Sequence, residues 1–517
     1  MQLSSAQSDR VGAARLTVQS AVPLVAVGLG LLLAVASGAI AASRGFDGLY
    51  GQDAYAYFDY STGSVRQSIL HLAPLEPFFW PPGYPLLVAI ASLVVGPVAL
   101  AGQLVSLLMG ALVPVLTALL VRELWPDDFA WALLAGGMVA VCGQLWQSSV
   151  VVMADTTGLA LATFSALALV RYARARHWAW LLAASAAIAY ATLARWIYGL
   201  VALPLGVYAL MVLLESRRVT RGAVVHACAA LAVAGLILVP AVAQPLFGLI
   251  RNPGQPAAFA GNFQVYSWSP LNALRRDFFT ADGHLAYAQP NGVYYAVAPV
   301  NPAYFGPLLA VWILPGLWAA RRWPVRNIVL IVGWAAIVYA FHAGAPWQNF
   351  RFTLAYLPPL AILAAAGILL AWRWVQASRR PLRVVVAGCV GIGLLISGGA
   401  AVRLVERFID TKDQELTLVH WVQSQTPTSA ELFSFGPTLA FRHYSSTPTF
   451  DLFDLSSGDV RSILTDQRPH YLLVDIGSVE TQWLGQAPST NFHLLRDEAG
   501  LTELGTAEGY TLYQIAR

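Results

Sequence analysis

Two aspartates lie beside long apolar segments of the chain, where a carboxylate is costly. Asp53 follows the first apolar segment in "YGQDAYAYFDY", and Asp155 opens a later one in "VVMADTTG". Each could be a helix N-cap, whose side-chain oxygen accepts a hydrogen bond from a free backbone N–H. Acidic side chains at the edge of a membrane are otherwise functional hypotheses by default. We therefore predict that both carboxylates face one polar cavity.

Three arginines stand apart from the clusters of basic residues in the chain. Arg66 lies in the loop after the first apolar segment, whereas Arg195 and Arg351 lie at the ends of later segments, in "TLARWIYG" and "NFRFTLAYLPPL". A guanidinium group at that depth can extend to the lipid head groups, or it can bind a lipid phosphate through two parallel hydrogen bonds. His342 and Asn349 crowd the short loop before Arg351, which favours phosphate binding by that arginine.

The composition indicates the class of protein to which these residues belong. Of the 517 residues, 57% are hydrophobic and 11% are charged, whereas soluble domains carry charge on about 25% of their residues. The mean hydropathy of +0.60 predicts a polytopic membrane protein. Cys142, Cys228 and Cys389 all lie in apolar segments, so we expect small core residues and no disulfide framework. The net charge of +4 does not indicate a nucleic-acid partner.

Eleven apolar runs are candidates for membrane spans. They comprise residues 21–42, 98–121, 129–145, 157–170, 178–193, 197–214, 224–246, 305–320, 328–341, 352–372 and 384–402. The first run is longer than the apolar part of a secretory signal, so we interpret it as an uncleaved anchor.

One more apolar run, residues 83–96 ("GYPLLVAIASLVVG"), is short and follows Pro81 and Pro82. If it does not cross the bilayer, the arginine clusters of the later loops share one side with Arg10 and Arg15, as the positive-inside rule requires. If it crosses, those clusters lie on the opposite side from the N-terminal arginines. We therefore predict a membrane-embedded helix that does not cross.

This topology divides the chain into three parts and places its polar residues outside. Residues 1–20 form a cytoplasmic N-terminus, and residues 21–403 form the transmembrane region, with a first outer loop at 43–97 and a long outer loop at 247–302. In residues 404–517, helical stretches alternate with short apolar strands, which predicts a small extracytoplasmic α/β domain. The long outer loop interleaves rings and amides in "FAGNFQVYSWSPLNALRRDFF", a composition that suits either a carbohydrate or an interfacial aromatic belt.

The order of these features resembles the GT-C superfamily of glycosyltransferases. The relevant segments are "GQDAYAYF", "PFFWPPGYPLLVA", "ADTTGLALATFSALALVRYARAR" and "NFRFTLAYLPPLAILAAAG". They are similar to bacterial relatives of protein O-mannosyltransferases and of lipid A aminoarabinose transferases, the family 39-like glycosyltransferases. The resemblance covers residues 21–403, and the trailing α/β domain is similar to the soluble C-terminal domains of many such enzymes.

The resemblance implies an inverting transfer of a monosaccharide from a polyprenyl-phosphate donor to an acceptor hydroxyl. The acceptor would be a glycolipid, a polysaccharide or a protein at the extracytoplasmic face of the bacterial inner membrane. By match, Asp53 is the acid at the acceptor, Asp155 is the second acid of the cavity, and Arg351 binds the donor phosphate. Arg195 and Arg66 are further phosphate-binding candidates. A phosphate monoester has a second pKa near 6 and leaves without a general acid, so one base is sufficient.

Six further residues are expected to line the substrates: Tyr55, Tyr57, His71, Glu76, His342 and Asn349. The aminoarabinose transferases have an acidic and a basic residue directly before the Pro-Pro pair, whereas this chain has Phe79 and Trp80. This departure weakens the assignment of a metal site there and of lipid A as the acceptor. Glu76 and His71 could substitute for the missing groups, and a divalent metal ion stays an open alternative.

Two other classes of function are compatible with a polytopic chain. A transporter or lipid flippase should show repeated halves and broken helices that meet at the membrane midplane, but the sequence has no evident repeat. A noncatalytic scaffold for envelope assembly would use Asp53 and Asp155 as helix caps.

Overall fold

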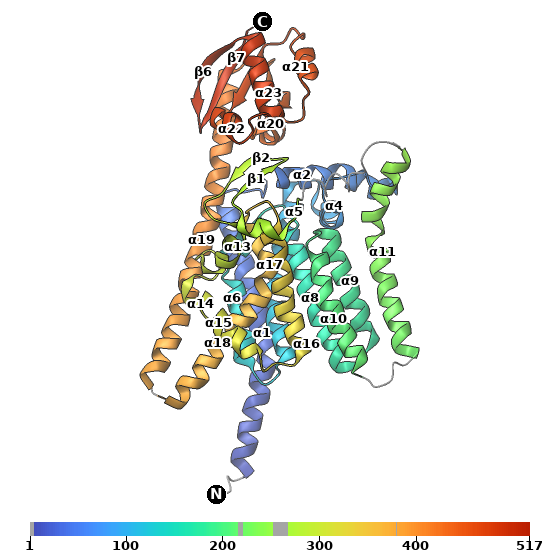
Figure 1. The fold of residues 1–517 in the computed structure, drawn as a ribbon, viewed down its shortest axis with the longest axis vertical. Coiled ribbons are helices and arrows are strands. Elements are labelled where there is room, and N and C mark those ends of the chain that lie inside the picture. Colours follow the sequence, from blue (N-terminus) through green and yellow to red (C-terminus); the bar gives the residue numbers. More distant parts are fainter. Residues whose placement is uncertain (1–4, 216–220, 252–266, 379, 517) are drawn as a thin grey trace.

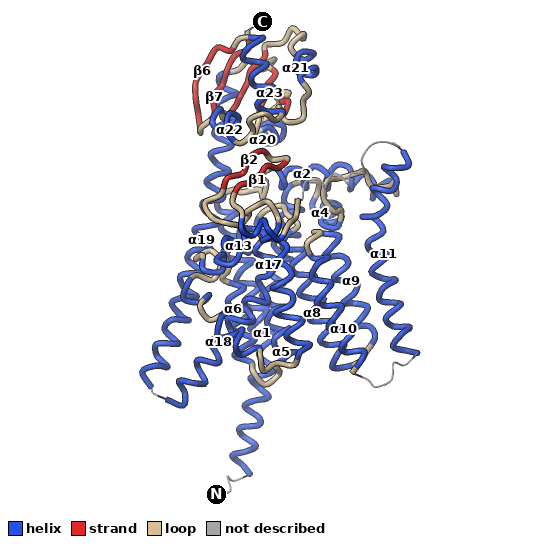
Figure 2. The backbone as a smooth tube through the Cα atoms, in the orientation of Figure 1, coloured by secondary structure: helices blue, strands red, loops and turns tan. Residues whose placement is uncertain are grey.

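The computed structural model describes residues 5–215, 221–251, 267–378 and 380–516. Long helices form a bundle, and a small domain of strands and short helices stands at the end opposite the N-terminus (Figure 1). The tube in Figure 2 shows that strands occur in that domain and in one hairpin below it. The predicted combination of a helical membrane region and a C-terminal α/β domain is thereby confirmed.

Within the described residues, seven helical segments are long and apolar enough to cross a bilayer. They are α1 (Ser5–Ser43), α5 (Ala99–Leu124), α8 (Asp155–Ala175), α11 (Arg221–Arg251), α18 (Leu357–Ser378), α19 (Arg380–Gln425), and the continuous run of α16 (Val325–Ile328), η4 (Val329–Gly333) and α17 (Trp334–Gly344). Two helices bent by 56°, α6 (Phe129–Ala140) and α7 (Gly143–Val150), make an eighth if they are counted as one span. Shorter apolar helices include α9 (Trp178–Ala194), α10 (Tyr198–Leu214), α14 (Pro307–Ala310) and α15 (Ile313–Ala320). The number of eleven spans stays a prediction.

The run at 83–96 forms a short helix, α4 (Gly83–Val95), of 13 residues. Its length is about 20 Å, less than the hydrocarbon core of about 30 Å. Gly96 adopts a positive φ of 91°, a conformation that glycine tolerates best, and the chain turns there into α5. Figure 1 places α4 beside α2 (Gln52–Tyr60), at the end of the bundle that carries the C-terminal domain. That the helix does not cross the bilayer stays a prediction, which its short length favours.

The first outer loop lies across the end of the bundle (Figure 1). Helix α2 continues through the π-helical turn η1 (Ser61–Val65) into α3 (Arg66–His71). The ring of Tyr60 stacks on Phe78 with centroids 4.0 Å apart, and Tyr57 lies 5.2 Å from Trp80. These aromatic contacts attach α2 to the segment that leads into α4.

A second polar segment connects α11 to the later helices, although residues 252–266 of the predicted loop 247–302 lie outside the described residues. Its elements are η2 (Pro270–Leu274), the antiparallel strands β1 (Asp277–Thr280) and β2 (Gly283–Ala286), α13 (Asn291–Val297) and η3 (Ala298–Val300). The hairpin contacts the C-terminal domain, because the His284 backbone N–H donates to the Gln482 carbonyl at 2.7 Å.

The C-terminal domain is held away from the bundle by α19. This helix has 46 residues and is about 70 Å long, so it extends well beyond the hydrocarbon core. The predicted boundary at residue 404 therefore lies inside one continuous helix. The sheet has the order β4-β3-β5-β7-β6 and mixes parallel and antiparallel pairs. Its elements are β3 (Glu431–Ser434), α20 (Thr438–Tyr444), β4 (Thr449–Asp451), α21 (Ser457–Ile463), β5 (His470–Val474), α22 (Ile476–Thr481), α23 (Ala487–Leu494), η6 (Leu495–Ala499), β6 (Leu501–Ala507) and β7 (Tyr510–Ile515).

The three cysteines differ in burial. Cys142 is buried, Cys389 is half-buried and Cys228 is exposed on α11. All three are free thiols, as the sequence predicted. The expectation that each is a core residue is wrong for Cys228, because α11 packs against the rest of the protein mainly through α9 and presents most of its surface outward.

Candidate active site

Four charged side chains form a chain of ion pairs. The Nη2 atom of Arg351 donates to Oδ2 of Asp53 at 2.7 Å, and its Nε atom lies 3.6 Å from Oδ2 of Asp155. The other oxygen of Asp155 lies 2.6 Å from Nη1 of Arg195. The structure thus unites two predicted acids and two predicted phosphate-binding arginines, which come from four separate segments. We refer to Asp53, Asp155, Arg195 and Arg351 as the charge cluster.

Both aspartates lie inside the first turn of a helix. Asp53 is the second residue of α2, after the N-cap Gly51, and Asp155 is the first residue of α8, after the N-cap Ala154. Neither aspartate is therefore the N-cap residue. The free backbone N–H groups at a helix N-terminus stabilise a nearby negative charge. The capping alternative is wrong for both residues, and their carboxylates are available to the arginines.

Backbone and side-chain contacts hold the two acid-bearing loops together. The backbone N–H of Val152 donates to the carbonyl of Gly48 at 3.0 Å. The side-chain amide of Gln103 donates to the carbonyls of Phe46 and Val150, at 3.1 and 3.0 Å. Gly48 has a φ of 87°, and a Cβ atom there would lie 3.1 Å from the Val150 carbonyl oxygen. A glycine at this position therefore lets the loop before Asp53 lie directly against the loop before Asp155.

The two arginines lie where helices end or begin. Arg195 directly follows α9 in an extended conformation. Arg351 lies in the first turn of the 3-10 helix η5 (Phe350–Tyr356), and its backbone N–H donates to the side-chain oxygen of Asn349 at 3.0 Å. Asn349 is therefore the N-cap of η5 rather than a residue that faces the charge cluster. Its contribution is to hold the segment that carries Arg351.

The charge cluster is largely removed from solvent. The exposed fraction is 4% for the Asp155 side chain, 18% for Arg351, 20% for Arg195 and 28% for Asp53. Two acids and two bases balance each other, as buried charges require. Oδ2 of Asp155 and Nε of Arg351 are buried and make no hydrogen bond within the described part of the chain. Asp53 is the most exposed member, so its carboxylate is the most accessible from outside the cluster.

Aromatic rings surround the charge cluster. The guanidinium carbons of Arg195 and Arg351 lie 5.3 and 5.6 Å from the ring centre of Phe352, within the range of cation–π attraction. His342 is buried and stacks on Phe352 at 5.2 Å, and neither of its ring nitrogens is hydrogen-bonded to a described residue. Tyr57 is buried near the cluster, and burial raises the pKa of its phenol well above the ordinary value. Tyr57 is therefore a neutral group at any pH at which the protein works.

Four other predicted site residues lie elsewhere. Tyr55 is buried against α19, where its hydroxyl contacts Lys412 and Glu415. Arg66 begins α3 and forms no ion pair with the cluster among the described residues, and His71 and Glu76 are exposed. Tyr55 shares α2 with Asp53 but points elsewhere, because successive residues of a helix are about 100° apart, whereas Arg66 and His71 belong to α3 and Glu76 lies in the segment after it.

Two residues of the site were missed from the sequence. The sulfur of Met153 lies 2.5 Å from Nη1 of Arg351, and the Tyr198 hydroxyl lies 3.5 Å from the carbonyl oxygen of Asp155. Both belong to the same short segments as predicted residues, "VVMADTTG" and "TLARWIYG". Their proximity to Asp155 and Arg195 along the chain was the available signal.

The described residues contain no group of three His, Cys, Asp or Glu side chains that could hold a metal ion. The carboxylates of Asp53 and Asp155 are paired with guanidinium groups. The positive charge of these groups would repel a metal cation, so the two acids do not fit a metal site. No step of the chemistry is therefore assigned to a metal.

One family model matches the sequence. Its description is dolichyl-phosphate-mannose-protein mannosyltransferase, and the match covers residues 80–243. This range includes α4 and two members of the charge cluster, Asp155 and Arg195. No curated protein matches the sequence significantly.

Solved structures show the same fold over almost the whole chain. The crystal structure of ArnT from Cupriavidus metallidurans bound to undecaprenyl phosphate matches with a TM-score of 0.61 and 16% identity, over 95% of this chain and 97% of that one. Its apo state matches with a TM-score of 0.60, with the same identity and coverage. The archaeal oligosaccharyltransferase AglB from Archaeoglobus fulgidus matches at a TM-score of 0.44, with 16% identity, over 79% of this chain and 58% of its own. The family match and the fold shared with ArnT confirm the predicted resemblance to the GT-C superfamily.

Proposed function

We propose that this GT-C glycosyltransferase transfers a monosaccharide from a polyprenyl-phosphate donor to an acceptor hydroxyl, with inversion at the anomeric carbon. The observation that carries the proposal is the charge cluster, in which one accessible carboxylate is paired with an arginine that a second, buried carboxylate also holds. The family match over residues 80–243 and the fold shared with ArnT support transfer from a lipid-linked sugar.

The arginines are suited to the donor phosphate. A guanidinium group binds phosphate oxygens through parallel hydrogen bonds, and Arg351 already presents its donors at the accessible edge of the cluster. Arg195 lies on the other side of Asp155 and adds a second positive charge. Donor binding would place a phosphate against Arg351 in competition with Asp53. The incoming phosphate would then weaken the ion pair and free the Asp53 carboxylate.

Asp53 is proposed as the general base. Its carboxylate takes the proton of the acceptor hydroxyl while the acceptor oxygen bonds to the anomeric carbon. The bond between that carbon and the phosphate oxygen breaks, and the electron pair leaves with the phosphate, whose charge the arginines stabilise. Because the acceptor attacks from the face opposite the phosphate, the configuration inverts. Asp155 holds both arginines in place and does not exchange a proton.

The proposed setting is the extracytoplasmic face of the bacterial inner membrane. The charge cluster lies in the segments that the arginine distribution assigns to the outer side, and the N-terminus would be cytoplasmic with the C-terminal domain outside. The acceptor would be a glycolipid, a polysaccharide or a protein.

A single substitution tests this function. Asp53→Asn keeps the size of the side chain but removes the base, so we expect the sugar transfer to be lost while the protein stays folded. The matched control is Asp59→Asn, an exposed aspartate on the same helix, which should leave transfer unchanged. Mass spectrometry of envelope glycolipids and glycans, in cells that lack the gene and are complemented with each variant, reports the product. Normal product with Asp53→Asn would show that Asp53 is not the base.

A further inference from the structure

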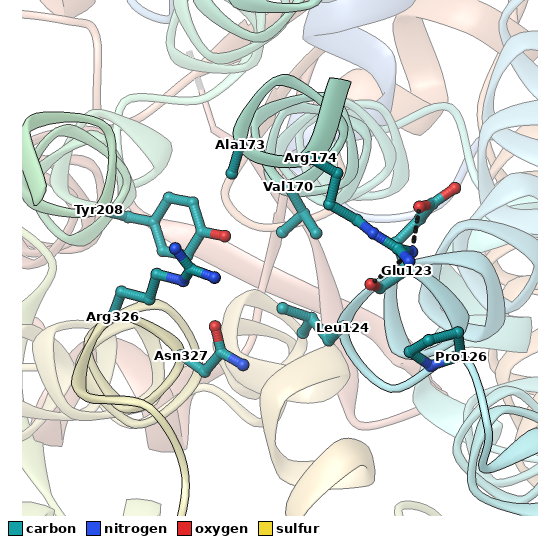
Figure 3. Close-up of a pocket in the computed structure, with 9 residues that line it drawn as sticks. All are labelled: Glu123, Leu124, Pro126, Val170, Ala173, Arg174, Tyr208, Arg326 and Asn327. Carbon is teal, nitrogen blue, oxygen red and sulfur yellow. Dashed lines mark hydrogen bonds and ion pairs between the residues drawn. The ribbon is translucent and has the colours of Figure 1, made fainter. Parts of the chain in front are cut away.

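A cavity of about 120 Å³ lies at the end of the bundle away from the charge cluster (Figure 3). It is bounded by the last turns of α5 and α8, the middle of α10 and the start of α16. Asp155 begins α8 and Arg174 lies in its last turn, so the two sites are separated by nearly the full helix, about 30 Å. The cavity is therefore independent of the proposed active site.

Three polar side chains line one side of this cavity. Tyr208 and Asn327 are buried residues, 1% and 5% exposed, and their side chains line the cavity. The Nε atom of Arg326 is buried and has no hydrogen-bond partner among the described residues. Figure 3 shows the three side chains together on one side of the cavity, opposite Arg174. Buried polar groups normally have partners, so the free Nε of Arg326, beside two further hydrogen-bond donors, indicates a bound polar group.

The charges around the cavity are predominantly positive. Glu123 pairs with Arg171 and Arg174, at 3.0 and 3.1 Å. Glu215 pairs with Arg326 and Arg176, at 2.5 and 3.3 Å. Among these described residues, four arginines thus share two glutamates, so the group carries a net charge of +2. This surplus favours an anion.

A group of tryptophans marks the level of the cavity in the membrane. Trp125 stacks on Trp131 with centroids 3.8 Å apart, and Trp323 lies 4.8 Å from Trp125. Leu124 and Pro126, which flank Trp125, line the cavity. Tryptophan is enriched at the boundary between the hydrocarbon core and the head groups. The cavity therefore lies at the depth at which phospholipid phosphates are found.

We propose that this cavity binds the phosphate of an anionic phospholipid head group from the leaflet opposite the active site. The Tyr208 hydroxyl, the Asn327 amide and Arg326 would donate hydrogen bonds to the phosphate, and Arg174 would supply further positive charge. Basic pockets between transmembrane helices on the cytoplasmic side bind anionic head groups in this way.

The test uses the full-length protein purified in detergent and stripped of lipid. Phosphatidylglycerol, phosphatidylcholine or inorganic phosphate is added, and the thermal unfolding midpoint and the lipid retained in native mass spectrometry are measured. We expect phosphatidylglycerol alone to raise the midpoint and to remain bound. The double variant Tyr208→Phe/Asn327→Ala should lower retention about fivefold for each hydrogen bond removed. Without lipid it should unfold at the wild-type temperature, because the deleted groups make no hydrogen bond to the residues that the structure describes.

Arg322→Gln is the matched control, since Arg322 is an exposed arginine near the same end of the bundle that does not line the cavity. It should retain phosphatidylglycerol as the wild type does. Undiminished retention by the double variant would overturn the proposal, as would equal retention of phosphatidylcholine. Equal stabilisation by inorganic phosphate would overturn the lipid assignment and identify the ligand as the free anion. If the double variant does not fold, Tyr208→Phe alone provides the same comparison.

Discussion

Arg351 is the residue on which the charge cluster depends, because it contacts both acids. Its Nη2 atom bonds to Asp53, its Nε atom lies beside Asp155, and its Nη1 atom meets the sulfur of Met153. All three nitrogen atoms of the planar guanidinium group therefore make contacts. A lysine has the same charge but only one nitrogen, and it cannot reproduce this arrangement.

Arg351→Lys should therefore impair the reaction while leaving the net charge of the protein unchanged. We expect kcat/KM for the lipid-linked donor to fall about 100-fold, the effect of losing one well-placed donor to a developing negative charge. Arg66→Lys is the control, since Arg66 lies outside the cluster, and it should retain wild-type kinetics. A larger loss in Arg66→Lys than in Arg351→Lys would reverse the assignment of the phosphate-binding arginine.

Asp155 should contribute to stability as well as to function. Its side chain is 4% exposed and holds Arg195 and Arg351. Asp155→Asn leaves the mostly buried Arg195 without its acid and Arg351 with Asp53 alone, which we expect to cost about 3 kcal/mol. The double variant Asp155→Asn/Arg195→Met removes one of those cations and should recover part of the loss. Thermal unfolding in detergent ranks the stability of the wild type, the single variant and the double variant. Equal stability of all three would contradict a structural role for Asp155.

At the scale of elements, helix α2 is held from two sides. Asp53 faces Arg351, whereas Tyr55, two residues later, faces α19. The Tyr55 hydroxyl donates to Glu415 at 3.0 Å and also contacts Lys412, the one lysine in the sequence, which is buried. The ammonium group of Lys412 lies 3.9 Å from the ring centre of Tyr444 on α20. The C-terminal domain therefore contacts the helix that carries the proposed base.

Tyr55→Phe tests whether this contact positions Asp53. The substitution keeps the ring and removes the hydroxyl, so α2 should stay folded but lose its attachment to Glu415. We expect kcat to fall about tenfold with the donor KM unchanged, because small displacements of a reacting group are costly. Arg44→Gln breaks only exposed ion pairs to α19 and should have no effect. A rise in donor KM with unchanged kcat would indicate that Tyr55 acts on donor binding instead.

At the scale of the whole molecule, the polar segments before Asp53, before Asp155 and around Arg351 meet at one end of the helical bundle, beneath the C-terminal domain. The N-terminus lies at the opposite end (Figure 1). This polarity depends on α4, because a crossing helix there would reverse every later helix. The orientation can be measured directly.

Single cysteines in a variant without Cys142, Cys228 and Cys389 should report this orientation. We expect Val98→Cys, at an exposed position between α4 and α5, to react in intact cells with a reagent that cannot cross the membrane. Asp127→Cys, exposed at the other end of α5, should react only after the membrane is opened. The reverse pattern of labelling would show that α4 crosses the bilayer.

The sequence alone determined the features that depend on local composition. The apolar runs predict the helices because, in lipid, the backbone N–H and C=O groups of each run must form hydrogen bonds within the same segment. The two prolines and the short length of 83–96 predict a helix that does not cross, and the alternating pattern after residue 404 predicts the α/β domain. Asp53, Asp155, Arg195 and Arg351 were predicted as site residues because charges at the edges of apolar segments are costly.

Only the tertiary structure decided how these residues combine. Asp53 and Arg351 are almost 300 positions apart, and no local pattern specifies that their side chains meet. The rotation of α2 about its axis turns Asp53 toward Arg351 and Tyr55 toward Lys412, and this rotation is fixed by packing against α19 and α20. The sequence identifies charges that need partners, and the packing of the helices selects which charges become partners.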